Sequence, residues 1–124
     1  MGMLSEEKEA LEDFIRSANN VYIYGYDWKR DDAVVEALRK YKTKAKIIVK
    51  NGEYNEELKT LPNVQLKEKE NLSMGDTFYK IAFERRKPRY LEIVYTDCDL
   101  IAILDIERIP SLLKFYHHFE REWR

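Results

Sequence analysis

The stretch from Arg89 to Glu107, RYLEIVYTDCDLIAILDIE, constrains the fold of this chain more than any other. It contains two apolar runs, Tyr90–Tyr95 and Leu100–Asp105, joined by the polar turn Thr96–Asp99. Continuous runs rich in Ile, Leu, Val and Tyr are typical of strands that are buried on both faces. The sequence therefore predicts a hairpin near the middle of a sheet.

A strand–helix–strand pattern precedes this hairpin in the first half of the chain. Val21–Tyr26 and Ala45–Val49 are apolar enough for buried strands, and a helical pattern between them ends at about Tyr41. Asp31 and Asp32 are residue types that cap helix starts, so we expect the helix to begin there. Two strands joined through one helix indicate a parallel pair with a right-handed crossover.

The remaining pattern completes one mixed α/β domain over residues 1–124. Its other predicted elements are a helix from Ser5 that ends at Asn19-Asn20, a short helical segment at Asn55–Leu61, strands at Val64–Leu66 and Thr77–Glu84, and a last helix that begins at Pro110. The expected order is α-β-α-β-(α)-β-β-β-β-α, a mixed sheet with flanking helices. An apolar stripe on the last helix ends at Trp123. We expect it to pack on the sheet or on a second chain.

Composition limits the classes of partner and the location. Charged residues make up 36% of the 124 residues, but the net charge is −1, so no global field attracts nucleic acid or a membrane. No apolar window is long enough to span a membrane, and no signal peptide is visible. The single Cys98 fits a reducing interior, so we expect a cytoplasmic protein. Abundant Lys and Glu favour a heat-adapted, thermophilic source.

Two segments resemble the phospholipase D superfamily. VYIYGYDWKRDDAVVEALRKYKTKAKIIVK is similar to the opening strand–helix–strand of one half-domain, and IPSLLKFYHHFEREWR is similar to its closing helix. Enzymes of that family carry H-x-K-x4-D between these segments. Tyr90, Glu92 and Asp97 occupy those three positions here, so only the aspartate matches.

The resemblance implies a fold but argues against the family's chemistry. In the family the His is the nucleophile, the Lys binds phosphoryl oxygens and the Asp supports the His. Tyrosine is a poor nucleophile because its ordinary pKa is about 10, and Glu92 would repel a phosphate. The chain resembles the degenerate effector-binding domain of TrmB-type archaeal regulators.

We therefore expect a non-catalytic module for ligand sensing or protein interaction, without a cofactor. The resemblance implies a homodimer or a DNA-binding regulatory partner, with a small-molecule effector and no membrane partner. Two other classes stay open. One is a phosphodiesterase or nuclease that uses unidentified residues, and the other is a nucleic-acid-binding protein.

The candidate ligand site combines a loop with the motif positions. Ligands of α/β sheets bind beyond the carboxyl ends of parallel strands. The loop that follows the first strand mixes aromatic faces with hydrogen-bonding groups suited to a sugar or nucleotide. The candidate ligand-binding residues are Tyr26, Asp27, Trp28, Lys29, Arg30, Tyr90, Glu92 and Asp97. Tyr22, Tyr24, Tyr26 and Trp28 are expected on one strand face, where core packing is the simpler interpretation.

A second candidate is a basic turn, which could bind nucleic acid or be a solvated hairpin tip. Its residues are Arg85, Arg86, Lys87 and Arg89, and Lys80 is assigned to the same cluster. No metal site is predicted. His117 and His118 point about 100° apart on a helix, while Asp97 and Asp99 are typical turn residues.

Overall fold

The computed structural model describes residues 5–98 and 100–124, with the side chain of Ser5 outside the description. The helices are α1 (Ser5–Arg16), α2 (Asp31–Tyr41) and α3 (Leu113–Trp123), with the short 3-10 helices η1 (Glu56–Thr60) and η2 (Pro110–Leu112). The strands are β1 (Asn20–Tyr24), β2 (Lys44–Lys50), β3 (Val64–Lys69), β4 (Thr77–Glu84), β5 (Lys87–Tyr95) and β6 (Leu100–Asp105). This order confirms the predicted α/β class.

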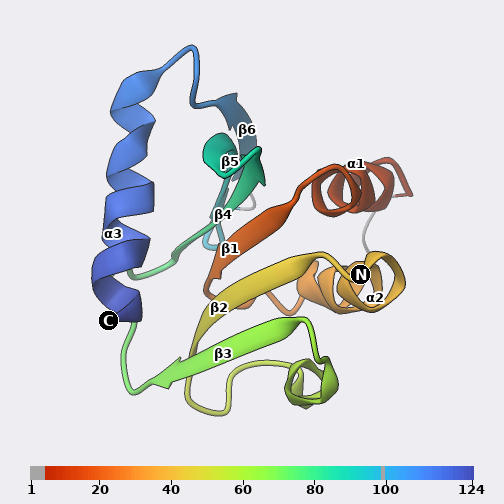
Figure 1. Cartoon of the computed structure of the whole chain (residues 1–124). Coiled ribbons are helices and arrows are strands. Elements are labelled where there is room, and N and C mark those ends of the chain that lie inside the picture. Colours follow the sequence, from red (N-terminus) through yellow and green to blue (C-terminus); the bar gives the residue numbers. More distant parts are fainter. Residues whose placement is uncertain (1–4, 99) are drawn as a thin grey trace.

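One sheet contains all the strands that the structure describes. Its order is β3-β2-β1-β4-β5-β6 (Figure 1). β1, β2 and β3 are parallel, whereas β4 runs antiparallel to β1 and is followed by the antiparallel strands β5 and β6. Within the described ranges, no helix has the length and apolar character needed to cross a bilayer.

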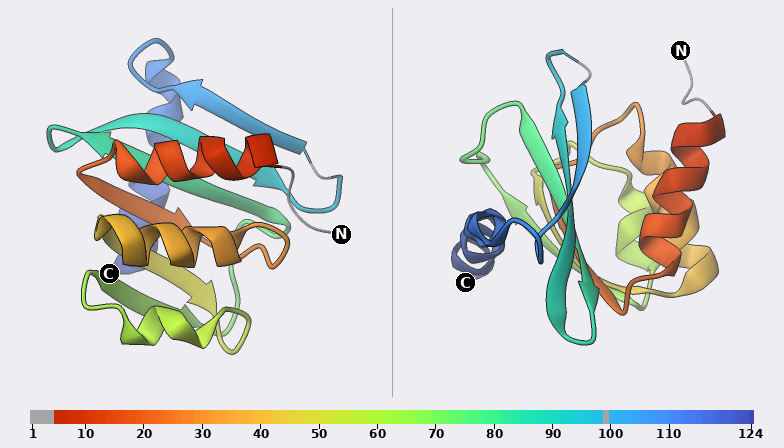
Figure 2. Two further views of the ribbon diagram at one scale, coloured as in Figure 1. Left: turned by 90° about the vertical axis from the view of Figure 1, so that its right-hand side faces the viewer. Right: turned by 90° about the horizontal axis from the view of Figure 1, so that it is seen from above.

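Helices cover both faces of the sheet (Figure 2). α1 and α2 lie on one face, and α3 lies on the other. Alternate residues of each strand point to opposite faces, which sorts the buried side chains into two clusters. Val21 and Ile23 pack under α1 and α2. Tyr22 and Tyr24 pack under α3.

The β5–β6 hairpin lies at one side of the sheet, so its predicted central position is wrong. β6 is the edge strand, and Leu100 and Ile103 are 54% and 50% exposed. The centre is formed by β1 and β4, which join the parallel half of the sheet to the antiparallel half. An apolar run favours a strand, but it does not specify how many neighbours that strand has.

Gly25 breaks the expected alternation of four aromatic residues. Its φ is +87°, and any side chain there would overlap the ring of Phe78. The strand ends at Tyr24, and the turn sends Tyr26 into the cluster under α1 and α2. The prediction that these aromatics share one face is therefore wrong.

The last helix packs on the sheet, as one of the two sequence alternatives proposed. Phe119 is buried and stacks on Tyr22 with 4.3 Å between ring centroids. Trp123 is half-buried and stacks on Phe119 at 6.0 Å. Aromatic stacking and apolar burial thus attach α3 to the centre of the sheet.

A hydrogen-bond network ties the same helix to the loop between β3 and β4. The Oγ of Ser73 lies 2.8 Å from His118 Nε2 and donates to Glu122 at 3.0 Å, while Tyr79 OH lies 2.7 Å from His118 Nδ1. Because the serine proton goes to Glu122, Nε2–H donates to Ser73 and Nδ1 accepts from Tyr79. Every group is satisfied only when the imidazole is neutral, and burial lowers the pKa of His118.

This network predicts a stability that falls in mild acid. A histidine whose folded-state pKa is lowered contributes stability that is complete above its ordinary pKa of about 6.5 and lost as the pH falls through the folded value. We expect the melting temperature to decrease between about pH 7.5 and 5.5, and His118→Gln to flatten that decrease.

Thermal melts across this range test the prediction, with the exposed neighbour as control. His117→Gln should keep the wild-type pH dependence. An unchanged slope in His118→Gln would show that the imidazole does not couple to folding.

Candidate functional site

A buried ion cluster lies where the sheet meets the start of α2. Lys80 of β4 is 1% exposed, and its Nζ lies 3.0 Å from Asp31 Oδ1 and 3.2 Å from Glu92 Oε1. Glu92 is opposite Lys80 in the β4–β5 register, and Asp31 is the first residue of α2. One ammonium therefore joins three elements that are distant in sequence.

The balance of burial and charge keeps Lys80 protonated. Burial alone would lower the pKa of its ammonium, but the adjacent charges of Asp31 and Glu92 outweigh burial and raise it. Burial also raises the pKa of the Asp31 carboxyl, and the charge of Lys80 opposes that shift. Each charge of the cluster therefore requires the others, because removing one leaves the remaining charges buried without compensation.

The sequence assignment of Lys80 to the basic turn is wrong. Lys80 lies between the buried residues Tyr79 and Ile81 and faces the helices together with Ala82. The two-residue period of the strand was the available signal, because it places Lys80 on the same face as Ala82. The grouping of Lys80 with Arg85–Arg89 rests on the proximity of these cations in sequence, and it does not use the strand period.

The loop after β1 is held together by the carboxylate of Asp27. This side chain accepts hydrogen bonds from the backbone N–H of Lys29 at 3.0 Å and from Arg30 Nη1 at 2.8 Å. Asp27 is buried, and the side chain of Arg30 is mostly buried. The loop therefore enters the site in a fixed conformation and is not a flexible linker.

Asp31 and Asp32 do not cap α2, contrary to expectation. Asp31 Oδ2 accepts from the backbone N–H of Asp27 at 2.8 Å, and Asp32 Oδ1 accepts from Tyr26 OH at 2.5 Å. The cap position is Arg30, which makes no side-chain cap hydrogen bond. Both aspartates instead tie the loop and α2 together.

A cavity of about 200 Å³ adjoins this cluster between α1 and the β5–β6 hairpin. Its lining residues are Glu7, Ala10, Leu11, Arg30, Glu92, Ile101 and Ile103. The Nε of Arg30 is buried there without a hydrogen-bond acceptor among the described residues, and Glu7 Oε2 is 4.0 Å away. The polar wall of the cavity thus consists of one guanidinium and two carboxylates, which suits a ligand with both acceptor and donor groups.

The structure brings only some of the predicted ligand residues to this cavity. Arg30 and Glu92 line it, and Asp27 supports Arg30. Trp28 is 56% exposed and packs edge-on against Tyr26 with 5.0 Å between ring centroids.

Two of the motif positions lie elsewhere. Tyr90 shares a sheet face with Glu92 but pairs with Asp105 at the far end of β6. Asp97 is in the turn between β5 and β6, and Asp99 is outside the described residues. The three motif positions therefore do not converge on the cavity.

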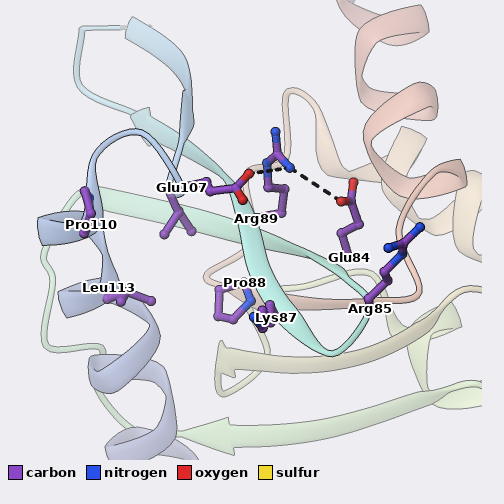
Figure 3. Close-up of a pocket in the computed structure, with 9 residues that line it drawn as sticks. Glu84, Arg85, Lys87, Pro88, Arg89, Glu107, Pro110 and Leu113 are labelled. Atoms are coloured by element: carbon purple, nitrogen blue, oxygen red, sulfur yellow. Dashed lines mark hydrogen bonds and ion pairs between the residues drawn. The ribbon is translucent and has the colours of Figure 1, made fainter.

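The basic turn borders a second, larger cavity of about 530 Å³ on the α3 side (Figure 3). Arg89 Nη1 lies 2.7 Å from Glu107 and 3.5 Å from Glu84, and Arg89 Nε lies 3.2 Å from Asp105. Figure 3 shows Arg89 extending toward Glu84 and Glu107. This arginine is surrounded by carboxylates, so it is a poor site for an anion.

Arg85 and Arg86 form the two-residue turn itself, with φ of +52° and +71°. Positive φ at both positions is the pattern of a type I′ hairpin turn, which favours Asn-Gly. Arginine in this left-handed region costs about 1 kcal/mol per residue. Both side chains are exposed, as is Lys87. The turn therefore holds two cations at a backbone position that disfavours them.

No cluster of three or more His, Cys, Asp or Glu side chains suited to a metal ion occurs in the part of the chain that the structure describes. Asp97 is exposed in its turn, and His118 is held by Tyr79 and Ser73.

Comparisons with known proteins show a likeness in structure alone. No protein-family model matches the sequence, and no curated protein matches it. Among solved structures, the fold is similar to TrmBL2, an archaeal chromatin protein whose structure shows a novel mode of DNA binding. The TM-score is 0.60 at 13% sequence identity, and the match covers 100% of this chain and 48% of the TrmBL2 chain. This chain thus has the fold of about half of TrmBL2.

The ion cluster predicts a large cost for removing its cation. Lys80→Ala leaves two carboxylates buried without a partner, and breaking a buried pair in this way costs about 3–5 kcal/mol. Urea denaturation measures the change. Arg39→Ala breaks an exposed pair with Glu57 and should cost about 0–1 kcal/mol. Equal losses in the two variants would contradict a structural role for Lys80.

Proposed function

We propose that this chain is a non-catalytic regulatory module of phospholipase D-like type. The observation that supports this most is the position of Glu92. In the resemblance, Glu92 occupies the place of the lysine that binds phosphoryl oxygens, and here its carboxylate is paired with the buried Lys80. A phosphate at that place would meet a negative charge, and Lys80 is 1% exposed. The pair of Glu92 with Lys80 therefore suits a structural role and does not suit the binding of a phosphoryl group.

The position of the family nucleophile supports the same proposal. Tyr90 is partly exposed, and its ring lies over the guanidinium of Arg89 at 5.0 Å. Arg89 is itself bound by Asp105 and Glu107. Tyr90 therefore belongs to a surface ion network, away from the cavity beside Arg30.

The ligand that suits the cavity is a small polyhydroxylated molecule. Hydroxyl groups can accept hydrogen bonds from the guanidinium of Arg30 and donate to Glu7 and Glu92, because all three side chains line the cavity. Leu11 and Ile103 supply apolar wall. A cavity of about 200 Å³ is below the usual range of roughly 300–1,000 Å³ for drug-sized ligands. A single sugar ring or a smaller polyol is the expected size.

The structural likeness supports a regulatory setting for such a sensor. TrmBL2 is a chromatin protein whose structure shows a novel mode of DNA binding, and this chain corresponds to about half of its length. We propose that the module acts with a DNA-binding regulatory partner, and that ligand binding to the module changes the activity of that partner.

The β6 edge of the sheet favours a homodimer as a further part of the proposal. β6 has a partner on only one side, and it carries exposed apolar side chains on both faces, Leu100 on one and Ile103 on the other. An exposed apolar edge strand is a template for pairing with another chain. Antiparallel pairing of two β6 strands about a two-fold axis would cover this edge.

A thermal-shift screen tests the sensor. A polyol or monosaccharide at about one hundred times its Kd should stabilise the fold by about 2.7 kcal/mol, which is several degrees. Glu7→Gln should abolish the shift, because Glu7 lines the cavity, whereas Glu9→Gln on the exposed side of α1 should not. Metal-independent hydrolysis of bis(p-nitrophenyl) phosphate that is lost in Asp97→Ala would instead establish an enzyme.

Light scattering after size-exclusion chromatography tests the homodimer. We expect wild-type protein to have the mass of two chains and Ile103→Lys to have the mass of one, because a charge at this edge opposes strand pairing. Ile109→Lys, at a residue of similar exposure beyond β6, serves as the control. Monomeric wild-type protein at micromolar concentration would refute the dimer.

A further inference from the structure

Cations from three separate segments lie together at the ends of neighbouring strands, away from the ligand cavity. Lys44 at the start of β2 is paired in register with Asn20 at the start of β1, and Asn20 is paired with Phe83 near the end of β4. The backbone N–H of Arg85 then donates to Asn19 Oδ1 at 2.9 Å. These contacts place the β4–β5 turn beside the starts of β1 and β2. We call this surface the basic edge, and its cations are Lys42, Lys44, Lys46, Arg85, Arg86 and Lys87.

Hollows connect these cations across the strand ends. Lys42, Lys44 and Lys46 line one hollow of about 360 Å³. Lys44 and Arg86 line the next, of about 340 Å³, and Asn20 lines both. Arg85 and Lys87 line the cavity shown in Figure 3. The two hollows lined by the lysines and Arg86 therefore share residues, while Arg85 and Lys87 extend the basic edge along the turn to a cavity that Glu84, Glu107 and Arg89 also line.

These cations are not neutralised within the fold. Among the described residues, none of the six forms an ion pair, although many other Lys and Arg side chains do. Glu84 and Glu107 line the cavity beside Arg85 and Lys87, but both pair with Arg89. Glu120 accepts from Tyr22 OH. The local field is therefore positive, despite the net charge of −1 for the whole chain.

The turn backbone indicates that this charge serves a purpose other than folding. Arg85 and Arg86 occupy positive-φ positions for which Asn and Gly are favoured, so the sequence retains two cations where they oppose turn formation. Backbone strain of this kind concentrates at functional sites. Replacing these arginines is therefore expected to stabilise the hairpin and to weaken binding at the turn.

We propose that the basic edge binds the phosphate backbone of nucleic acid without reading its sequence. The cations follow four neighbouring strand ends, which at about 4.8 Å per strand extend over roughly 14 Å. With one phosphate per about 3.4 Å along each strand of a duplex, that length corresponds to about four nucleotides. Tyr22, Phe83 and Tyr116 line one of the hollows, but Tyr22 and Phe83 are buried and Tyr116 is half-buried, so backbone contact is favoured over base stacking.

Fluorescence anisotropy with a labelled duplex of mixed sequence tests this proposal. Binding should weaken with salt, with a slope of log K against log salt of about −3, as expected for three or four phosphates. Arg85→Asn/Arg86→Gly should reduce the slope by about 2 and weaken binding at least tenfold, since each lost contact lowers the slope by about 1. The same variant should melt at or above the wild-type temperature, because Asn-Gly suits the turn.

A second variant and a matched control separate binding from folding. Lys44→Gln/Lys87→Gln removes two cations at ordinary backbone positions and should weaken binding to a similar degree. Lys8→Gln/Lys50→Gln removes two lysines that are paired with Glu36 and Glu53, and should bind as the wild type does.

Any of four results would overturn the proposal. They are no binding at low salt, an unchanged slope in both basic-edge variants, an equal loss in the control, or binding to anionic lipid vesicles in preference to the duplex. The effector screen is independent, because Glu7 belongs to α1 and lines the ligand cavity but none of the hollows of the basic edge, so Glu7→Gln should leave duplex binding unchanged.

Discussion

The ion triad of Lys80 with Asp31 and Glu92 is the interaction on which the other features of this structure depend. It joins β4, β5 and α2, and β4 is the strand that connects the parallel half of the sheet to the antiparallel half. A buried triad of this kind contributes less to net stability than its Coulomb energy suggests, because desolvating three charges is costly. Removing any one of its charges leaves the others buried without compensation, so the triad requires β4, β5 and α2 to be in place together.

The same triad connects the fold to the proposed function. In the proposed phospholipase D-like interpretation, Glu92 takes the place of the phosphate-binding lysine, and its carboxylate is paired with the buried Lys80. Arg30, next to Asp31 in the chain, lines the adjoining cavity together with Glu92. A ligand there would contact residues directly bonded to the triad, and could thereby shift α1 or the β5–β6 hairpin. The basic edge lies at the opposite ends of the strands, so ligand and polyanion would not compete for one surface.

The local sequence pattern was sufficient to predict the helices and strands and their order. The positions of strands in the sheet and the partners of charged side chains depend on tertiary contacts, which the pattern does not contain. The helical and strand periods predicted α2, β1 and β2 because each has a clear apolar face. The same signals could not place β6 at the edge, since an apolar strand looks alike with one neighbour or two. Lys80 was missed because a lysine in a strand is normally exposed, and only its neighbours across the sheet reveal its partners. The basic edge was seen only in part, because Lys44 and Arg86 are brought together by the register of β1 and not by sequence.

The charge state of Lys80 tests the central claim most directly. Nuclear magnetic resonance of the Lys80 side chain, followed from about pH 6 to 11, reports whether its ammonium stays protonated. The structure predicts titration above the ordinary value of about 10.4, with ammonium protons protected from exchange, because the carboxylates of Asp31 and Glu92 hold the charge. A Lys80 that is neutral near pH 7, or that titrates and exchanges like a solvent-exposed lysine, would contradict the triad and the account built on it.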